Sequence, residues 1–136
     1  MFGLVCALVM QSATISAGEP SYKDAYHKTA ESGKPLVILV GADWCPGCRT
    51  MKQSVIPQLE KQGDLAKVSF AYVNTDQDHE LAGKLMQGGS IPQLIVYRKT
   101  IRGWIRQQLT GAHSASETAA FIHRNPTAAT TSLTSN

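Results

Sequence analysis

The chain divides its apolar residues between short continuous runs and stripes that repeat at helical spacing. Residues 36–40 are apolar at every position, as expected for a strand that is covered on both faces. Three later segments have the length and apolar content of strands and are bounded by turn-forming residues. The pattern therefore predicts four strands, at residues 36–40, 68–74, 93–97 and 104–109.

Capping residues mark where helices begin and end. Ser21 followed by Asp24 is a start that resembles a capping box, and Gly33 with Pro35 marks a stop. Ser114 followed by Glu117 forms a second such box before an apolar stripe. These features predict helices at residues 21–32, from residue 46 onward, at residues 78–86, and from 114 to about 124.

The helix that begins at Pro46 has one apolar stripe. Proline suits a first helical position because its φ angle is fixed near the helical value. Pro57 should kink this helix or end it just before. The stripe places Cys48 on the buried face and leaves Cys45 at the exposed end of the helix. Its members are Cys48, Met51, Val55 and Leu59.

The order of elements predicts an α/β fold. Helices and strands alternate in the first part of the chain, which predicts right-handed parallel crossovers. Residues 98–103 are few enough for a hairpin, so the last two strands should be antiparallel. The expected result is a small mixed sheet between helices in one domain, residues 18–124, followed by a disordered Thr-, Ser- and Ala-rich tail at 125–136.

The N-terminal segment resembles a secretory signal. Residues 2–10 are apolar but too few to span a bilayer, and small residues precede a possible cleavage point after Ala17. We therefore expect a signal peptide over residues 1–17, loss of Cys6 on processing, and an exported, periplasmic protein. No Lys or Arg precedes the apolar run, although a secretory signal usually begins with a positive charge. Three alternatives therefore remain: the start of the sequence is placed too late, the signal is weak, or the segment is part of a membrane anchor. Under these alternatives the protein would be cytoplasmic or tethered to a membrane.

The charged residues and the possible metal ligands exclude several classes of protein. The 136 residues have a formal net charge of +3 with scattered basic side chains, which is unlike a nucleic-acid footprint. We expect no nucleic-acid partner and no membrane span in the mature chain. Zinc usually needs four ligands, and one cysteine pair with dispersed histidines does not supply them, so we expect no metal. The histidines are His27, His79, His113 and His123.

A dithiol motif carries the chemistry that the sequence predicts. Cys45 and Cys48 lie three positions apart, between the first strand and a helix. Unpaired N–H groups and the macrodipole at a helix start stabilise a thiolate, and only the thiolate attacks a disulfide. We therefore expect Cys45 to be the nucleophile and Cys48 the resolving thiol. An inert buried thiol pair is the alternative. No cofactor is expected, because the two sulfurs carry the electrons as a redox-active disulfide.

Over residues 21–124 the chain resembles the thioredoxin-fold family. Four features carry the resemblance, and their order and intervals are more specific than the cysteine pair alone. They are Trp44-Cys45-Pro46-Gly47-Cys48 between strand and helix, the segment 70–78, Ser90-Ile91-Pro92 before the strand 93–97, and Gly111-Ala112 before the last helix. The segment from Gly33-Lys34-Pro35 to Cys45 is similar to exported members of that family.

The resemblance implies a three-layer sandwich with a mixed sheet of four or five strands. It also implies a cis peptide bond before Pro92. Disulfide-containing polypeptides, together with an upstream thiol reductant or oxidant, are the partners that it implies. The substrate-binding residues carried over from the family are Trp44, Pro46, Gly47, Ile91 and Pro92.

Two positions depart from the cytosolic members of this family. Leu39 occupies the place of a buried Asp, and Tyr72 that of a Lys, so the second half of the reaction has no obvious base. The dipeptide between the cysteines is Pro-Gly, the reverse of the common order. The predicted function is protein disulfide reduction or exchange. The alternatives are a dithiol electron shuttle dedicated to one partner and a non-catalytic peptide-binding module.

Overall fold

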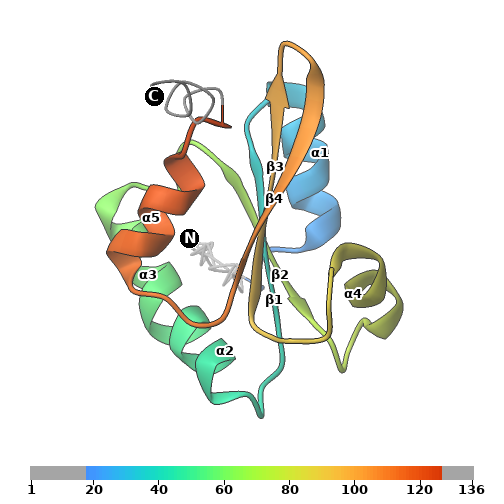
Figure 1. Cartoon of the computed structure of the whole chain (residues 1–136), viewed down its shortest axis with the longest axis vertical. Coiled ribbons are helices and arrows are strands. Elements are labelled where there is room, and N and C mark those ends of the chain that lie inside the picture. The colour runs from blue at the N-terminus through green and yellow to red at the C-terminus, as the bar shows by residue number, and fades with distance from the viewer. Residues whose placement is uncertain (1–17, 127–136) are drawn as a thin grey trace, which may run out of the picture.

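The computed structural model describes residues 18–126 as a four-stranded sheet with helices on both faces (Figure 1). The signal peptide predicted over residues 1–17, with Cys6, and the tail from residue 127 onward lie outside the described residues. Within residues 18–126 no helix has the length and hydropathy of a membrane span. The elements are α1 (Tyr22–Ser32), β1 (Leu36–Gly41), α2 (Pro46–Thr50), η1 (Met51–Val55), α3 (Ile56–Gln62), β2 (Ser69–Asn74), α4 (His79–Leu85), β3 (Gln93–Thr100), β4 (Gly103–Thr110) and α5 (Ala115–His123).

The sheet has the strand order β2-β1-β3-β4. β1 and β2 are parallel, β3 and β4 form the predicted antiparallel hairpin, and β3 also runs antiparallel to β1. The expectation of parallel crossovers is therefore right for β1 to β2 and wrong for β2 to β3. The described residues form four strands, the lower of the two numbers that the resemblance allowed.

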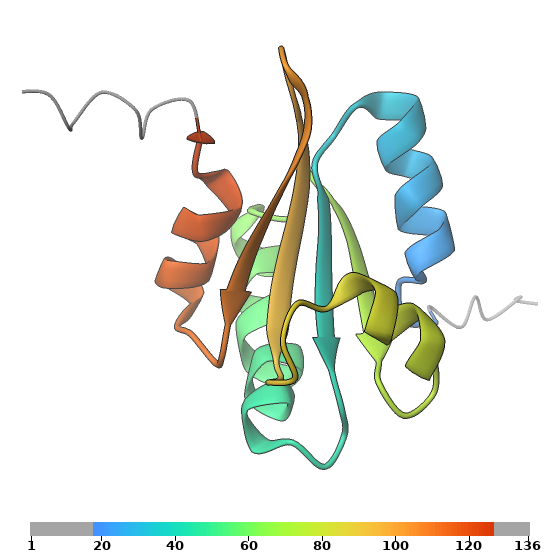
Figure 2. The ribbon, with the colours of Figure 1, turned by 45° about the vertical axis from the view of Figure 1, so that its right-hand side comes forward.

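The fold has three layers, as predicted. The helical run α2–η1–α3 and α5 cover one face of the sheet, and α1 and α4 cover the other (Figure 2). β1 is buried along its whole length. Val37 and Leu39 join the core beneath α3 and α5, whereas Ile38 and Val40 join the core on the α1 side. This two-sided burial explains why the strand has no alternation of polar residues.

The helical run from Pro46 to Gln62 passes through Pro57. Of the two outcomes predicted at Pro57, an end of the helix just before the proline does not occur. The disturbance is taken up by η1, a π-helical segment in which the Ile56 N–H donates to the Met51 carbonyl five residues earlier. Since proline has no N–H, a locally wider turn lets the helix continue without the bond that Pro57 cannot make.

Candidate functional site

Cys45 and Cys48 form a disulfide where β1 gives way to α2, with their Cα atoms 5.2 Å apart. Cys45 is the N-cap residue of α2, and its sulfur accepts a hydrogen bond of 3.2 Å from the Cys48 N–H. Pro46 occupies the first turn of the helix, as predicted. The sulfur thus lies at the end of a helix where N–H groups are otherwise unpaired and where negative charge is stabilised.

Both sulfur-bearing side chains are largely buried. Cys48 is 1% exposed, as predicted, but Cys45 is only 7% exposed, so the prediction that it stays at an exposed end is wrong. The covering residue comes from a distant loop: the carbonyl oxygen of Ile91 lies 3.8 Å from Cys45 Sγ. Ala42 and Ile91 complete a small apolar cluster around the two cysteines. Cys45 therefore offers little of its surface to a partner in the oxidised protein.

The loop that covers Cys45 contains a cis peptide bond between Ile91 and Pro92, which confirms the prediction. Pro92 is buried and Ile91 is partly exposed. Gly47 faces this loop, because a Cβ atom there would lie 3.3 Å from Pro92 Cδ and 3.4 Å from Ala112 Cβ. A larger residue at position 47 would separate the start of the helix from both loops. Three of the residues carried over from the resemblance therefore meet around Cys45, and Pro46 is exposed beside them.

A buried amide holds the loop in place from below. Gln93 is fully buried, and its Nε2 donates to the carbonyls of Gln87, Gly88 and Ser90 at 3.1, 3.2 and 2.9 Å. Its Oε1 accepts from the Gln87 N–H at 3.3 Å. All of its hydrogen bonds end on the backbone that leads to Pro92. Sequence reasoning missed this residue, since it expected only a strand at Gln93, although a polar residue beginning an apolar strand was a usable sign.

Trp44 lies on the exposed side of the site, with 66% of its surface exposed. Its Nε1 donates a hydrogen bond of 3.0 Å to Asp76 Oδ2 in the loop after β2. The Asp76 N–H in turn donates to the Asn74 side chain at 2.9 Å. The indole is therefore held beside the cysteines by a residue that lies 32 positions away in sequence. Asp76 was not predicted as a site residue, and nothing local in the sequence pairs it with Trp44.

On the interior side, Cys48 lies next to Gly41 and Tyr72. A Cβ atom on Gly41 would lie 2.9 Å from both Cβ and Sγ of Cys48 and 3.5 Å from the Tyr72 hydroxyl. Leu39, at the position of the missing acid, is fully buried. A cavity of about 110 Å³ reaches Cys48 here. It is lined by Ala42, Asp43, Cys48, Arg49, Lys52, Gln53 and Tyr72.

The electrostatics of this cavity keep Tyr72 protonated. Burial raises the pKa of Tyr72 to about 12, and the negative charges of Asp43, Glu19 and Asp76 act in the same direction. The ammonium group of Lys52 lies 4.2 Å from the centre of the Tyr72 ring and forms an ion pair with Glu19. Tyr72 can therefore donate a hydrogen bond at neutral pH but cannot accept a proton. Lys52, four residues after Cys48, was missed by sequence reasoning.

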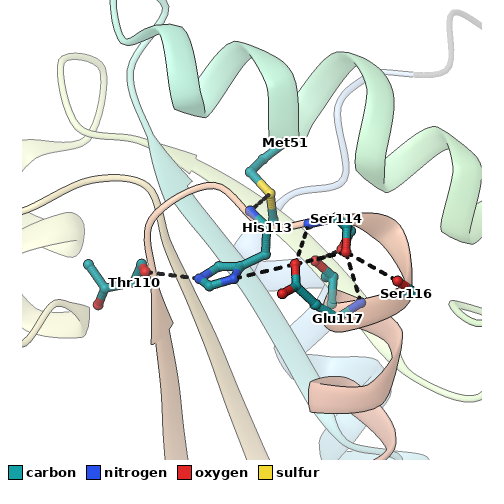
Figure 3. A network of polar contacts seen from close by, with 7 residues as sticks. Met51, Thr110, His113, Ser114, Ser116 and Glu117 are labelled. Atoms are coloured by element: carbon teal, nitrogen blue, oxygen red, sulfur yellow. Dashed lines mark hydrogen bonds and ion pairs between the residues drawn. The ribbon is translucent and has the colours of Figure 1, made fainter.

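The turn between β4 and α5 is tied to the active-site helix. The His113 N–H donates to the sulfur of Met51 at 3.4 Å, and His113 Nε2 lies 3.1 Å from the Thr110 carbonyl (Figure 3). Ser114 and Glu117 form the predicted capping box of α5. Backbone and side-chain hydrogen bonds from Ser114 hold the pKa of Glu117 below its usual value, with a smaller contribution from His113.

Metal-ligating side chains do not converge in the described part of the chain. Residues 18–126 contain no group of three or more His, Cys, Asp or Glu placed to hold an ion. Two histidines have carboxylate neighbours instead. His123 Nε2 lies 3.2 Å from Asp64 Oδ1, and His113 Nδ1 lies 3.9 Å from Glu117 Oε2.

The fold and the dithiol define a thioredoxin-like redox protein. The profile of the family described as thioredoxin-like matches residues 17–99, and the chain belongs to that family. Curated protein sequences give no significant match.

Solved structures with the same fold are thioredoxins and a relative of them. A thioredoxin from Thermus thermophilus aligns with a TM-score of 0.60 and 20% identity, covering 75% of this chain and 81% of the other. The protein named Trxlp from Edwardsiella tarda EIB202 aligns with a TM-score of 0.60 and 26% identity, covering 78% and 98%. The germline-specific thioredoxin Deadhead from Drosophila melanogaster gives 0.56 and 24%, covering 77% and 95%.

Replacing Gly41 by alanine should disturb Cys48. The added methyl group would overlap Cβ and Sγ of Cys48, neither of which is the free end of a long side chain. We expect a loss of about 1–3 kcal/mol in the free energy of unfolding, measured by urea denaturation of the oxidised protein. Gly83→Ala is the matched control, because open space surrounds Gly83 within α4 and alanine favours a helix. A Gly41→Ala protein as stable as the parent would contradict the packing described.

Glu117→Gln should lower the melting temperature at pH 7 but not in acid. Because the folded-state pKa of Glu117 lies below its unfolded value, the carboxylate stabilises the fold above the unfolded pKa. This stabilisation is lost as the pH falls through the folded-state pKa, so the two melting temperatures should converge once the pH lies well below that pKa. Glu31→Gln, which removes an exposed carboxylate of α1, is the charge-matched control. A gap of unchanged size throughout the acid titration would exclude the charge effect.

Proposed function

We propose that this protein is a thiol–disulfide oxidoreductase that reduces or exchanges disulfides in other polypeptides. The observation that supports the proposal most directly is the Cys45–Cys48 disulfide at a helix start, with Cys45 Sγ accepting the Cys48 N–H. The same hydrogen bond would stabilise a Cys45 thiolate once the disulfide is reduced. Membership of the thioredoxin-like family is consistent with this chemistry.

The reaction starts from the reduced pair. The Cys45 thiolate attacks one sulfur of the substrate disulfide, which breaks that bond and releases the other substrate sulfur as a thiolate. Cys45 is then joined to the substrate as a mixed disulfide. In the second step the Cys48 thiolate attacks Cys45 Sγ, the Cys45–Cys48 disulfide forms, and the second substrate thiolate leaves. The substrate gains two electrons, and an upstream thiol reductant must return two to the protein.

The second step requires Cys48 to lose its proton. Leu39 cannot accept it, and Tyr72 is already protonated. Asp43 is the one carboxylate among the residues that line the cavity at Cys48, so we assign it as the proton acceptor. Arg49 and Lys52 line the same cavity, and their positive charges favour the Cys48 thiolate.

The substrate surface consists of Trp44, Pro46, Gly47, Ile91 and Pro92. Ile91 presents its backbone next to Cys45, where an extended polypeptide could pair with it like an added strand. The exposed indole of Trp44, fixed by Asp76, offers an apolar face beside this position. These contacts are sequence-tolerant, which suits a protein that acts on many disulfides.

We also propose that the protein is exported. The support is the apolar segment at residues 2–10 followed by small residues up to Ala17 in the sequence. In that setting the upstream electron donor or acceptor would be another exported thiol protein.

Substitution of each cysteine should separate the two steps. Cys45→Ser removes the nucleophile and should abolish reduction of insulin by dithiothreitol-coupled turnover. Cys48→Ser should accumulate a mixed disulfide through Cys45, detected by mass spectrometry after alkylation. Cys6→Ser is the matched control and should retain turnover, because no role is assigned to that thiol.

Retained turnover in Cys45→Ser, or no trapped species in Cys48→Ser, would refute the assigned roles. If the parent protein undergoes thiol exchange but does not reduce insulin, the dedicated electron shuttle replaces the proposal. If the parent binds unfolded peptides and its cysteines stay inert, the non-catalytic module replaces it.

Asp43→Asn should slow the second step. We expect the lifetime of the mixed disulfide to rise by roughly tenfold or more, because a positioned base usually contributes at least that factor. The effect should shrink at high pH, where Cys48 ionises without help. Asp64→Asn, two residues beyond the end of α3, is the charge-matched control. An unchanged lifetime across the pH range would remove Asp43 from the mechanism.

A further inference from the structure

The β3–β4 hairpin projects beyond the rest of the sheet, at the end opposite α2, whose N-cap residue is Cys45 (Figures 1 and 2). The last residue of β3 paired with β1 is Tyr97, but β3 and β4 continue for three further pairs, up to Thr100 and Gly103. At the strand rise this is about 10 Å of two-stranded ribbon beyond the last pair with β1. The turn is well ordered, since Thr100 Oγ1 donates to the Gly103 carbonyl at 2.8 Å and accepts from the Arg102 N–H at 3.2 Å.

The tip of this hairpin exposes apolar and aromatic side chains. Ile101 is 99% exposed at the apex, and Trp104, two pairs back, is 48% exposed. Tyr26 on α1 is 52% exposed and lies across a hollow of about 540 Å³ that Trp104 and Lys99 also line. Of the four large apolar or aromatic side chains that are exposed within residues 18–126, only Trp44 lies outside this region. Exposed apolar residues usually lie singly over a protein surface, so a cluster of them indicates a surface that contacts a partner.

The charged side chains of the hairpin itself have one sign. The sequence contains no Asp or Glu from residue 81 to residue 116. Arg98 and Arg106, lower in the hairpin, are engaged with backbone carbonyls of Ile122 and Leu85. Lys99 and Arg102 flank the exposed Ile101 and have no ion-pair partner in the described part of the chain. The tip therefore presents two available cations beside an apolar apex.

We propose that this hairpin tip docks on an anionic lipid membrane surface. Entry into a bilayer interface requires a projecting apolar point with cations beside it, and Ile101 with Lys99 and Arg102 provides this combination. Ile101 would enter deepest. Trp104 and Lys99 are paired about 7 Å behind the apex. At that depth they would lie among the lipid headgroups, where tryptophan and lysine are favoured. Cys45 would then face away from the membrane, open to polypeptides in solution.

The test uses phosphatidylcholine vesicles with and without phosphatidylglycerol, and it is independent of the redox activity. In a Trp44→Phe background the fluorescence reports on Trp104 alone. We expect the full-length protein to co-sediment with the anionic vesicles, with a blue shift of the Trp104 emission that high salt reverses. Binding to both vesicle types with no blue shift, or no binding to anionic vesicles at low salt, would overturn the proposal.

Matched variants in the same full-length chain assign the binding to the tip. Arg102→Gln should weaken partitioning about fivefold, the effect expected for one basic residue at a charged membrane. Ile101→Ser should weaken it by roughly tenfold through lost apolar burial. Lys84→Gln, which makes the same charge change on α4 at the other end of the sheet, should change it less than twofold. Circular dichroism and melting curves confirm that each variant is folded.

Two outcomes of these variants would exclude the proposal. If Lys84→Gln weakens binding as much as Arg102→Gln, the attraction comes from overall charge and not from the tip. If the protein is retained by polyglutamate but not by anionic vesicles, the tip recognises acidic polypeptides and the membrane assignment is wrong.

Discussion

The site depends on one hydrogen bond, from the Cys48 N–H to Cys45 Sγ. A helix start leaves its first N–H groups without partners, and here a sulfur supplies the acceptor that Ser, Thr or Asp usually provides. The geometry holds because β1 is buried on both faces and ends directly before the turn, so that the core fixes where α2 begins. The structural role of the Cys45 sulfur as a cap and the chemical role proposed for it as an anion have the same physical origin.

Local sequence signals were sufficient for most of the fold. Continuous apolar runs identified the strands, and capping residues such as Ser114 located the helix ends. What they could not determine was strand direction: the β2–α4–β3 segment looks like a parallel crossover, yet β3 runs antiparallel to β1. At Pro57 only one of the two predicted outcomes, an end of the helix, is absent, for a related reason. The rule for proline in helices predicts which hydrogen bond is lost. It does not predict the π-helical turn that lets the helix continue without that bond.

At the site, the cysteine pair and the cis proline were predictable and their surroundings were not. Cys45, Cys48 and Pro92 follow from motifs, whereas the low exposure of Cys45 arises from Ile91, a residue 46 positions away. The pairs Trp44–Asp76 and Tyr72–Lys52 likewise join residues that only the tertiary fold brings together. Sequence reasoning did note that Leu39 and Tyr72 replace the expected acid and lysine. The structure adds that a small cavity with Asp43 on its wall occupies the region behind Cys48.

Gln93 gives the site a property that its cysteines alone would not have. Its buried amide bonds four backbone groups of residues 87–90, so the loop leading to Pro92 is ordered when the domain folds. Under the proposed function, the loop has lost its conformational entropy before an extended polypeptide arrives, so that only the polypeptide must become ordered on association. Ordering of the loop therefore takes nothing from the affinity for such a partner.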